Sequence, residues 1–264
     1  MKEKIEAPKL VKELVPLIDF HSEVHEESYL QGYSICDLLI EEEELPYLRL
    51  DSCYFKNCVF ENCVCENIDM VDIIFKNCEI SNLHFLNGAI HRIQFKNCRC
   101  MGIEFSNCTL QNIVFTNCNA RYSNFSGSKL KQVRFEECEL SSSSFIQCTF
   151  SKTWFENSKL DESEFFNTSL HSVDFSSSSI EGIAVSQNML EGAIVNSHQA
   201  LEMAKLLGLV IKEKCIRKGA KVMWIILGIG TLISTIINIY FGINKHVYTK
   251  WATAFALSFI SLTV

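Results

Sequence analysis

The chain lacks the residue patterns on which most enzymes and metal-binding proteins depend. Its 264 residues contain no C-x-x-C pair and no phosphate-binding glycine loop, and its isolated histidines belong to no catalytic motif. Positive charge is also in short supply, with 24 Lys and Arg against 31 Asp and Glu and a net charge of −7. We therefore predict a protein that is not an enzyme, uses no cofactor or metal ion, and does not bind nucleic acid directly.

Cysteine, by contrast, is abundant, with 13 residues. Most of them recur at multiples of five, which disulfide frameworks and zinc sites do not require. We interpret them as small apolar side chains that stack in a core. So many free thiols favour a reducing cytosol.

A period of five dominates more than half of the chain. Every fifth residue from Leu50 to Val195 is apolar, thirty positions without an exception. This period fits neither a helix, with about 3.6 residues per turn, nor a flat strand, in which side chains alternate between two faces. It fits a chain that turns a corner every five residues, because each fifth side chain then enters the same interior. The sequence predicts a square coil.

Two further registers accompany these apolar centres. Small or aliphatic residues lie two positions before most centres and complete a narrow core, while Asn recurs two positions after them. Asn tolerates left-handed backbone, so we expect it at the corners. All centres ending in 5 from Phe75 to Phe175 are Phe. With four centres per coil, the rings would occupy two opposite sides.

These residues make the chain resemble the pentapeptide-repeat family, whose consensus has a small residue two positions before a central Leu or Phe. The resemblance covers about Leu48 to Val195 and implies an all-β solenoid, folded as a right-handed quadrilateral β-helix. The position before the centre departs from the family, in which it is usually Asp or Asn. Here it is mixed, as in Tyr54, Val59 and Trp154.

The segment before the repeat has a different composition. Residues 1–47 contain the acidic run Glu41–Glu44, and we predict that they form an N-terminal cap over the open end of the coil. Four residues within this segment nevertheless keep the five-residue phase, so the coil could begin early and irregularly: Leu30, Ile35, Ile40 and Leu45. The β-helix proper is assigned to residues 48–195.

In residues 196–211 the apolar side chains have a helical period. Ser197, which precedes them, is a suitable N-cap. The pattern is similar to the terminal helix of the quinolone-resistance branch of the family, which caps the coil and joins two coils end to end. A cap alone is one interpretation. The apolar stripe favours the other, a capping helix that also forms a homodimer through four candidate residues: Ala200, Leu201, Ala204 and Leu207.

Residues 212–264 combine a basic flank with apolar runs. Val222 to Gly242 has no formal charge over 21 residues, which is long enough to cross a bilayer. We predict a C-terminal transmembrane helix over 222–242, in the bacterial inner membrane, with the repeat domain in the cytoplasm because the basic residues precede the span. A buried helix of a soluble protein is the alternative. Trp251–Val264 is shorter and reads as a re-entrant or truncated second span.

Two functional hypotheses follow. In the first, the chain is a membrane-tethered scaffold that binds a protein partner. In the second, which the resemblance implies, it is a DNA mimic that binds DNA gyrase or topoisomerase IV and protects it from quinolones. The last third of the repeat has the most acidic balance and supplies the candidate partner-binding residues: Glu136, Glu137, Glu139, Asp161, Glu162 and Glu164.

Overall fold

The computed structural model describes residues 4–25, 27–206 and 208–211, which belong to one compact unit, Met1–Ile211. Within these ranges no helix has the length and apolar character needed to cross a membrane. The predicted transmembrane helix over 222–242 and the second apolar run lie outside the described residues.

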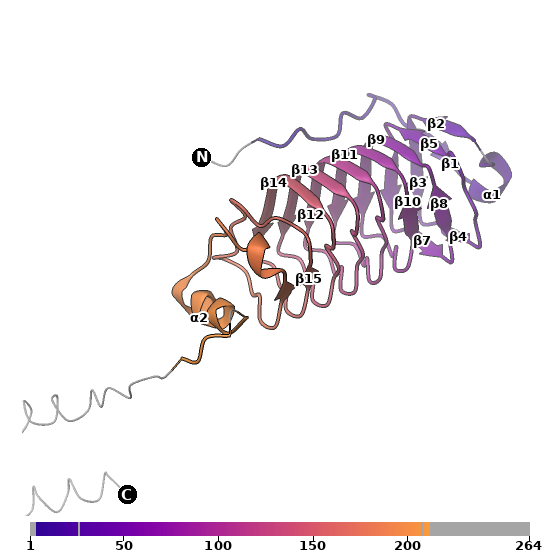
Figure 1. The fold of residues 1–264 in the computed structure, drawn as a ribbon. Helices are drawn as coiled ribbons and strands as arrows, with labels where there is room; N and C mark the ends of the chain where they lie inside the picture. The colour runs from indigo at the N-terminus through magenta and orange to yellow at the C-terminus, as the bar shows by residue number, and fades with distance from the viewer. Residues whose placement is uncertain (1–3, 26, 207, 212–264) are drawn as a thin grey trace, which may run out of the picture. The chain divides into compact units, whose positions relative to one another are not determined.

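The described chain winds into a coil of short parallel strands (Figure 1). From residue 29 onward, paired residues in neighbouring coils differ by 20 positions, so Phe75 lies opposite Phe95 and Phe95 opposite Phe115, whereas β1 (Val15–Leu17) is offset from β3 (Tyr33–Cys36) by 18. A coil therefore contains four five-residue sides. This confirms the predicted all-β solenoid, and it explains the period of five, because each side contributes one central residue to the interior.

Some strands span a single five-residue side of the coil, and others are longer and turn a corner. Those that cross a single side are β1 (Val15–Leu17), β2 (Tyr29–Gln31), β3 (Tyr33–Cys36), β4 (Leu39–Glu41), β5 (Arg49–Asp51), β6 (Tyr54–Lys56), β7 (Val59–Glu61), β8 (Val64–Glu66), β10 (His84–Leu86), β15 (Glu164–Phe165) and β16 (Ala184–Val185). Those that continue round a corner onto a second side are β9 (Asp69–Lys76), β11 (Ala89–Lys96), β12 (Thr109–Thr116), β13 (Lys129–Glu136) and β14 (Thr149–Glu156). The helical segments are α1 (Phe20–Glu23), the 3-10 turn Gln187–Met189 and α2 (Ser197–Leu206).

Two columns of phenylalanine rings fill the core. Phe95 and Phe115 stack with ring centroids 4.5 Å apart and planes 4° apart, and the column continues in steps of 20 residues to Phe175. The second column runs from Phe85 to Phe165. Rings of the two columns meet edge to face, as Phe115 and Phe125 do at 90°. The predicted placement of Phe on two opposite sides is confirmed, and apart from Phe60 and Phe150 smaller residues occupy the two sides between the columns.

Asn occupies the corners, as predicted. All twelve residues of the Asn register have left-handed backbone, with φ between 49° and 57°. Along one corner the side-chain amides also form a ladder, in which each Nδ2 donates to the Oδ1 of the residue one coil earlier, as Asn117 does to Asn97 at 3.1 Å. The ladder ends where Asn57 donates to the carboxylate of Asp37.

The inward residue two positions before each centre has a role beyond filling space. Where it is Cys, Ser or Thr rather than Ile or Val, its thiol or hydroxyl can donate to a backbone carbonyl 23 residues earlier, as in Cys148 to Phe125 at 3.0 Å and Ser163 to Leu140 at 2.8 Å. Cys, Ser and Thr are interchangeable here because each combines small volume with one donor. The prediction of a small apolar side chain captured the volume but not this hydrogen bond.

The coil begins earlier than the predicted boundary at residue 48. Leu30 pairs with Leu50 and Ile40 with Phe60, so the segment assigned to an N-terminal cap already contributes strands. The apolar residues of this segment keep the five-residue phase and are buried in the same core. The cap itself is shorter: Phe20 of α1 and Val24 are 4% and 2% exposed and cover the first coil.

At the other end, α2 covers the last coil and confirms the predicted capping helix, although its bounds are narrower than 196–211. Asn196 rather than Ser197 is the N-cap, since its Oδ1 accepts the N–H groups of His198 and Gln199 at 3.0 Å. In turn, Gln199 Oε1 accepts a hydrogen bond from the Asn196 N–H at 2.8 Å. This is a capping box.

Candidate functional site

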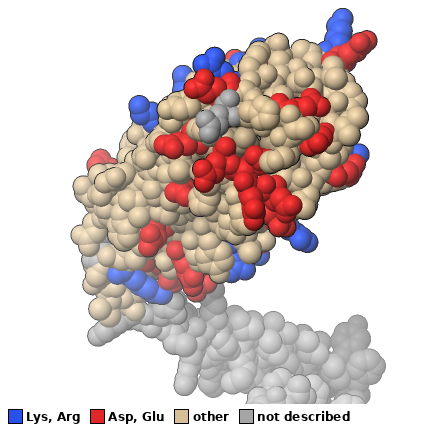
Figure 2. All heavy atoms as spheres, turned by 90° about the vertical axis from the view of Figure 1, so that its right-hand side faces the viewer, with Lys and Arg blue, Asp and Glu red and all other residues tan. Residues whose placement is uncertain are grey.

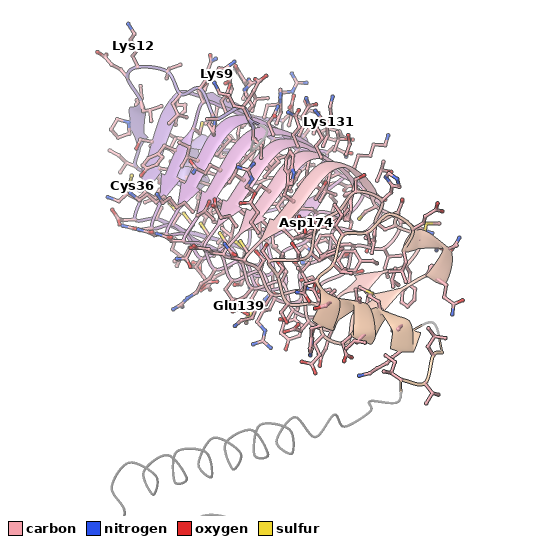
Figure 3. The ribbon with its side chains drawn as sticks, turned by 90° about the vertical axis from the view of Figure 1, so that its left-hand side faces the viewer. Lys9, Lys12, Cys36, Lys131, Glu139 and Asp174 are labelled. Atoms are coloured by element: carbon pink, nitrogen blue, oxygen red, sulfur yellow. The ribbon has the colours of Figure 1, made fainter. Side chains whose placement is uncertain are left out.

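The predicted acidic residues lie on neighbouring sides of the last coils. Glu136 ends β13, Glu137 takes the next corner with φ of 55°, and Glu139 lies on the following side, where Figure 3 labels it. The remaining three come from later coils, because Asp161 and Glu162 follow Leu160, one coil after Leu140, and Glu164 begins β15. The six therefore span three of the four sides over successive coils, and Glu136 and Glu164 lie on the opposite sides that carry the two ring columns.

Several of these acids already have partners. Glu139 accepts from Lys159 at 2.6 Å, and this bond raises the pKa of Lys159. Asp161 accepts from the Glu181 N–H at 2.8 Å, and Glu162 from the Ser142 hydroxyl at 3.1 Å. Of these three acids only Glu139 is paired with a cation, whereas the hydrogen bonds to Asp161 and Glu162 come from neutral donors and leave their charges in place.

A second acidic region lies at the opposite end of the coil (Figure 2). We call it the N-terminal end surface. Its acids come from the first two coils and are mostly exposed: Glu41, Glu42, Glu43, Glu44 and Glu61. Among the described residues only Glu43 of these five has an ion-pair partner, His21 at 2.7 Å. Glu41 and Glu61 are opposite each other in β4 and β7, so like charges adjoin.

The same surface carries large apolar side chains that contact solvent. Ile18 is 81% exposed, Leu39 55% and Tyr47 53%. All three belong to the first coil or its cap. Apolar residues surrounded by charge at the open end of a solenoid are typical of a contact surface for another protein. The acidic run is visible in the sequence, but its apolar neighbours are not, because they come from separate elements and share no period.

The four candidate dimerisation residues do not form one exposed stripe. Ala200 is exposed and Leu201 is 43% exposed, whereas Ala204 is half-buried and Leu207 lies outside the described residues. The helix turns Gln199 and Met203 toward the coil. Gln199 Nε2 donates to the carbonyls of Phe175 and Ser178 at 2.9 and 2.7 Å, which closes the last coil. The sequence signal for this role is the N-x-x-Q spacing of Asn196 and Gln199.

The thiols of the core are poorly suited to chemistry. Burial raises the pKa of Cys148 to about 12 and that of Cys108 to about 11. Cys138 is an exception, because the hydrogen bond from Cys118 lowers its pKa. Across the described ranges, no three His, Cys, Asp or Glu side chains are grouped so that they could hold a metal ion.

The coil geometry agrees with sequence comparison. Residues 68–145 match the sequence model of the pentapeptide repeat region. The chain contains a pentapeptide repeat region. The coil continues on both sides of the matched segment, over strands that keep the same 20-residue register. No curated protein matches the chain.

Solved structures with a similar coil are distant in sequence. QnrB1, a plasmid-mediated fluoroquinolone resistance protein, is 20% identical over 67% of this chain and all of its own, with a TM-score of 0.39. Rfr23 from the cyanobacterium Cyanothece is 10% identical over 47% of this chain and 91% of its own, with a TM-score of 0.33. HetL from Nostoc, a protein involved in heterocyst differentiation, is 10% identical over 66% of this chain and 96% of its own, with a TM-score of 0.25.

Proposed function

We propose that this chain is a non-enzymatic scaffold that binds a protein partner through the N-terminal end surface. The observation that carries the proposal is the combination there of acids that have no ion-pair partner in the described part of the chain, such as Glu41 and Glu42, with exposed Ile18 and Leu39. Charge steers encounter and selects the partner, while apolar side chains supply most of the affinity. The partner therefore presents basic residues around an apolar pocket.

The coil suits this role because its surface is rigid. Each outward side chain is fixed at the coil spacing of about 4.8 Å by the parallel ladders, and stacked rings hold the interior. A preformed surface loses little conformational entropy on binding. The repeat is therefore a rigid scaffold that holds the residues of the N-terminal end surface in fixed positions.

We further propose that residues 222–242 tether the scaffold to the bacterial inner membrane, with the coil in the cytoplasm. The support is the apolar sequence of this segment and the basic residues before it. A homodimer through the exposed part of α2, around Leu201, is compatible with this arrangement.

Site-specific crosslinking tests the binding surface. A photoreactive amino acid at position 39 of the full-length protein should give a covalent adduct with one partner in cells. The same amino acid at Tyr122, which is 56% exposed and lies four coils further along the solenoid, serves as the matched control and should give none. Equal adducts at both positions would contradict the proposal.

Charge reversal provides the second arm of this test. Glu41→Lys with Glu42→Lys should abolish the adduct, because a basic partner would then be repelled. Glu181→Lys with Glu191→Lys changes the net charge equally at exposed positions near the other end and should leave it intact. If both pairs act alike, net charge rather than this surface determines binding.

The acidity of the two ends favours a second candidate function, protection of DNA gyrase by DNA mimicry. Acids that stand in for duplex phosphates would compete for the basic DNA-binding surface of a type II topoisomerase. The purified protein would then protect gyrase supercoiling from a fluoroquinolone, and protection should fall between about 50 and 200 mM salt. Neutralising Glu136, Glu137 and Glu139 together should weaken it more than any single change. Absence of protection at low salt would eliminate this candidate.

A further inference from the structure

Residues 4–14, which we call the N-terminal strap, run back along the outside of the coil (Figure 1). The strap follows a single corner, made of residues 20 positions apart. Its Lys9 N–H donates to Asp72 Oδ1 at 2.8 Å, and its Glu6 N–H lies 3.4 Å from Asn112 Oδ1, two coils further along. At the near end of the corner Val11 lies over Gly32, where an added Cβ would be 3.2 Å from the Val11 methyl group.

The corner residues under the strap are buried, unlike most corner residues of the coil. Ser52, Asp72 and Asn112 are 5%, 6% and 2% exposed. Corner residues of the neighbouring column, such as Asn97 and Asn117, are exposed. The strap therefore removes an otherwise solvated polar row from water, and each buried polar group needs a hydrogen-bond partner.

Asp72 is held as an anion. Burial raises its pKa, but hydrogen bonds from Arg92 and from the Lys9 N–H outweigh burial, so the net pKa shift is downward. Arg92 binds the carboxylate with two bonds of 2.6 Å, from Nε to Oδ1 and from Nη2 to Oδ2. This anchor of the strap remains intact in mildly acidic solution.

The second anchor depends on His91. Asn112 directs Oδ1 at the strap, so its Nδ2 points to His91 Nε2 at 3.1 Å, and an amide nitrogen can only donate. Arg92 Nη1, another donor, lies 3.2 Å from Nδ1 and 3.5 Å from Nε2 of the same ring. The ring must offer a lone pair, which an imidazolium lacks. His91 is consequently neutral while the strap is bound.

We propose that His91 makes the docking of the N-terminal strap depend on pH, so that the strap lies on its corner when His91 is neutral and leaves its outer anchor when His91 is protonated. Protonation leaves only donors on the ring. Asn112 then turns its Oδ1 to His91 and presents Nδ2 to the Glu6 N–H, so that two donors face each other. The bond that holds the outer part of the strap is lost.

The charges around His91 set the direction of the effect. Burial lowers the pKa of His91, the Arg92 cation lowers it further and Lys9 acts the same way, while Glu6 and Asp72 oppose them. The neighbours in register on β9 and β12, Val71 and Gln111, carry no charge. Because the docked state has the lower pKa, docking is favoured above the ordinary pKa of about 6.5 and is lost as pH falls below it.

Hydrogen–deuterium exchange of the full-length protein tests this proposal. Strap amides, including those of Glu6 and Lys9, should be protected at about pH 7.5 and at least about tenfold less protected at about pH 5, relative to the free peptide at each pH. Amides of β12 and β13 in the same samples report whether the coil stays folded. Unchanged strap protection between the two conditions would overturn the proposal.

Two variants identify the titrating group. His91→Gln keeps an acceptor for Asn112 but does not titrate, so its strap should stay protected at both pH values. His84→Gln is the matched control, because His84 pairs with Glu104 at 2.6 Å and does not contact the strap, and it should lose protection as the wild type does. In the wild type the NMR titration midpoint of His91 should coincide with that of strap release. A His91→Gln strap that still detaches with pH, or midpoints that differ, would refute the role of His91.

Discussion

Replacing Phe115 by Ala removes the centre of the ring system. Phe115 is fully buried, stacks on Phe95 at 4.5 Å and on Phe135 at 4.9 Å, and meets Phe125 edge to face. The neighbours cannot collapse into the space, because their backbones are fixed in parallel ladders above and below. Phe→Ala in a core costs about 3–5 kcal/mol, and two lost ring stacks place this site near the upper limit, at about 4–5 kcal/mol.

Urea unfolding of the full-length protein measures this loss. Phe150→Ala is the matched control, because Phe150 is only half-buried and should lose less. Lys96→Ala on the exposed surface should change the free energy of unfolding by under about 0.5 kcal/mol. If Phe115→Ala proves as mild as Lys96→Ala, the stacked core described here does not stabilise the coil.

Three further predictions concern the cap, the thiols and the tail. Gln199→Ala should destabilise by about 2–3 kcal/mol, because it removes the hydrogen bonds to the Ser178 and Phe175 carbonyls, of which Phe175 keeps only its bond from the Ser178 N–H, and because it removes the capping box, whereas exposed His198→Ala should cost under about 0.5 kcal/mol in the same unfolding assay. Among the described cysteines, only the half-buried Cys36 should react readily with a thiol reagent at neutral pH, and the rest should react after denaturation; fast labelling of the folded core would contradict the burial. The full-length protein should sediment with membranes and resist carbonate extraction, while truncation after Ile216 should release a soluble coil; an intact protein found in the soluble fraction would refute the tether.

The sequence was sufficient for the coil because its determinants are local and repeated. Five residues set one side, and the same choice of centre and corner recurs, so Phe115 and Asn117 could be placed without coordinates. The early start of the coil was harder to place, because the pairing of Leu30 with Leu50 involves a segment whose other residues are irregular. Whether a residue near the end of a solenoid is buried depends on the cap that covers it as well as on the five-residue period.

The surfaces were predicted less well for a different physical reason. Charge counted along the chain indicated an acidic C-terminal end but not which charges are paired, since Lys159 meets Glu139 across coils. The strap joins residues separated by 63 positions at Asp72 and by 106 at Asn112. Such contacts are single side-chain bonds to backbone, and they leave no periodic trace in the sequence.

The 20-residue register also restricts how this chain can change in length. Loss of five residues within the repeat would keep every centre inward but rotate all later sides by a quarter turn, so that rings would stack on the Leu and Cys of adjoining sides. Loss of ten would restore ring on ring but transfer each later outward side chain to the opposite side. Only insertions or deletions of twenty preserve both the interior and the pattern of charges. A change in length that preserves the surface pattern of this protein therefore adds or removes whole coils.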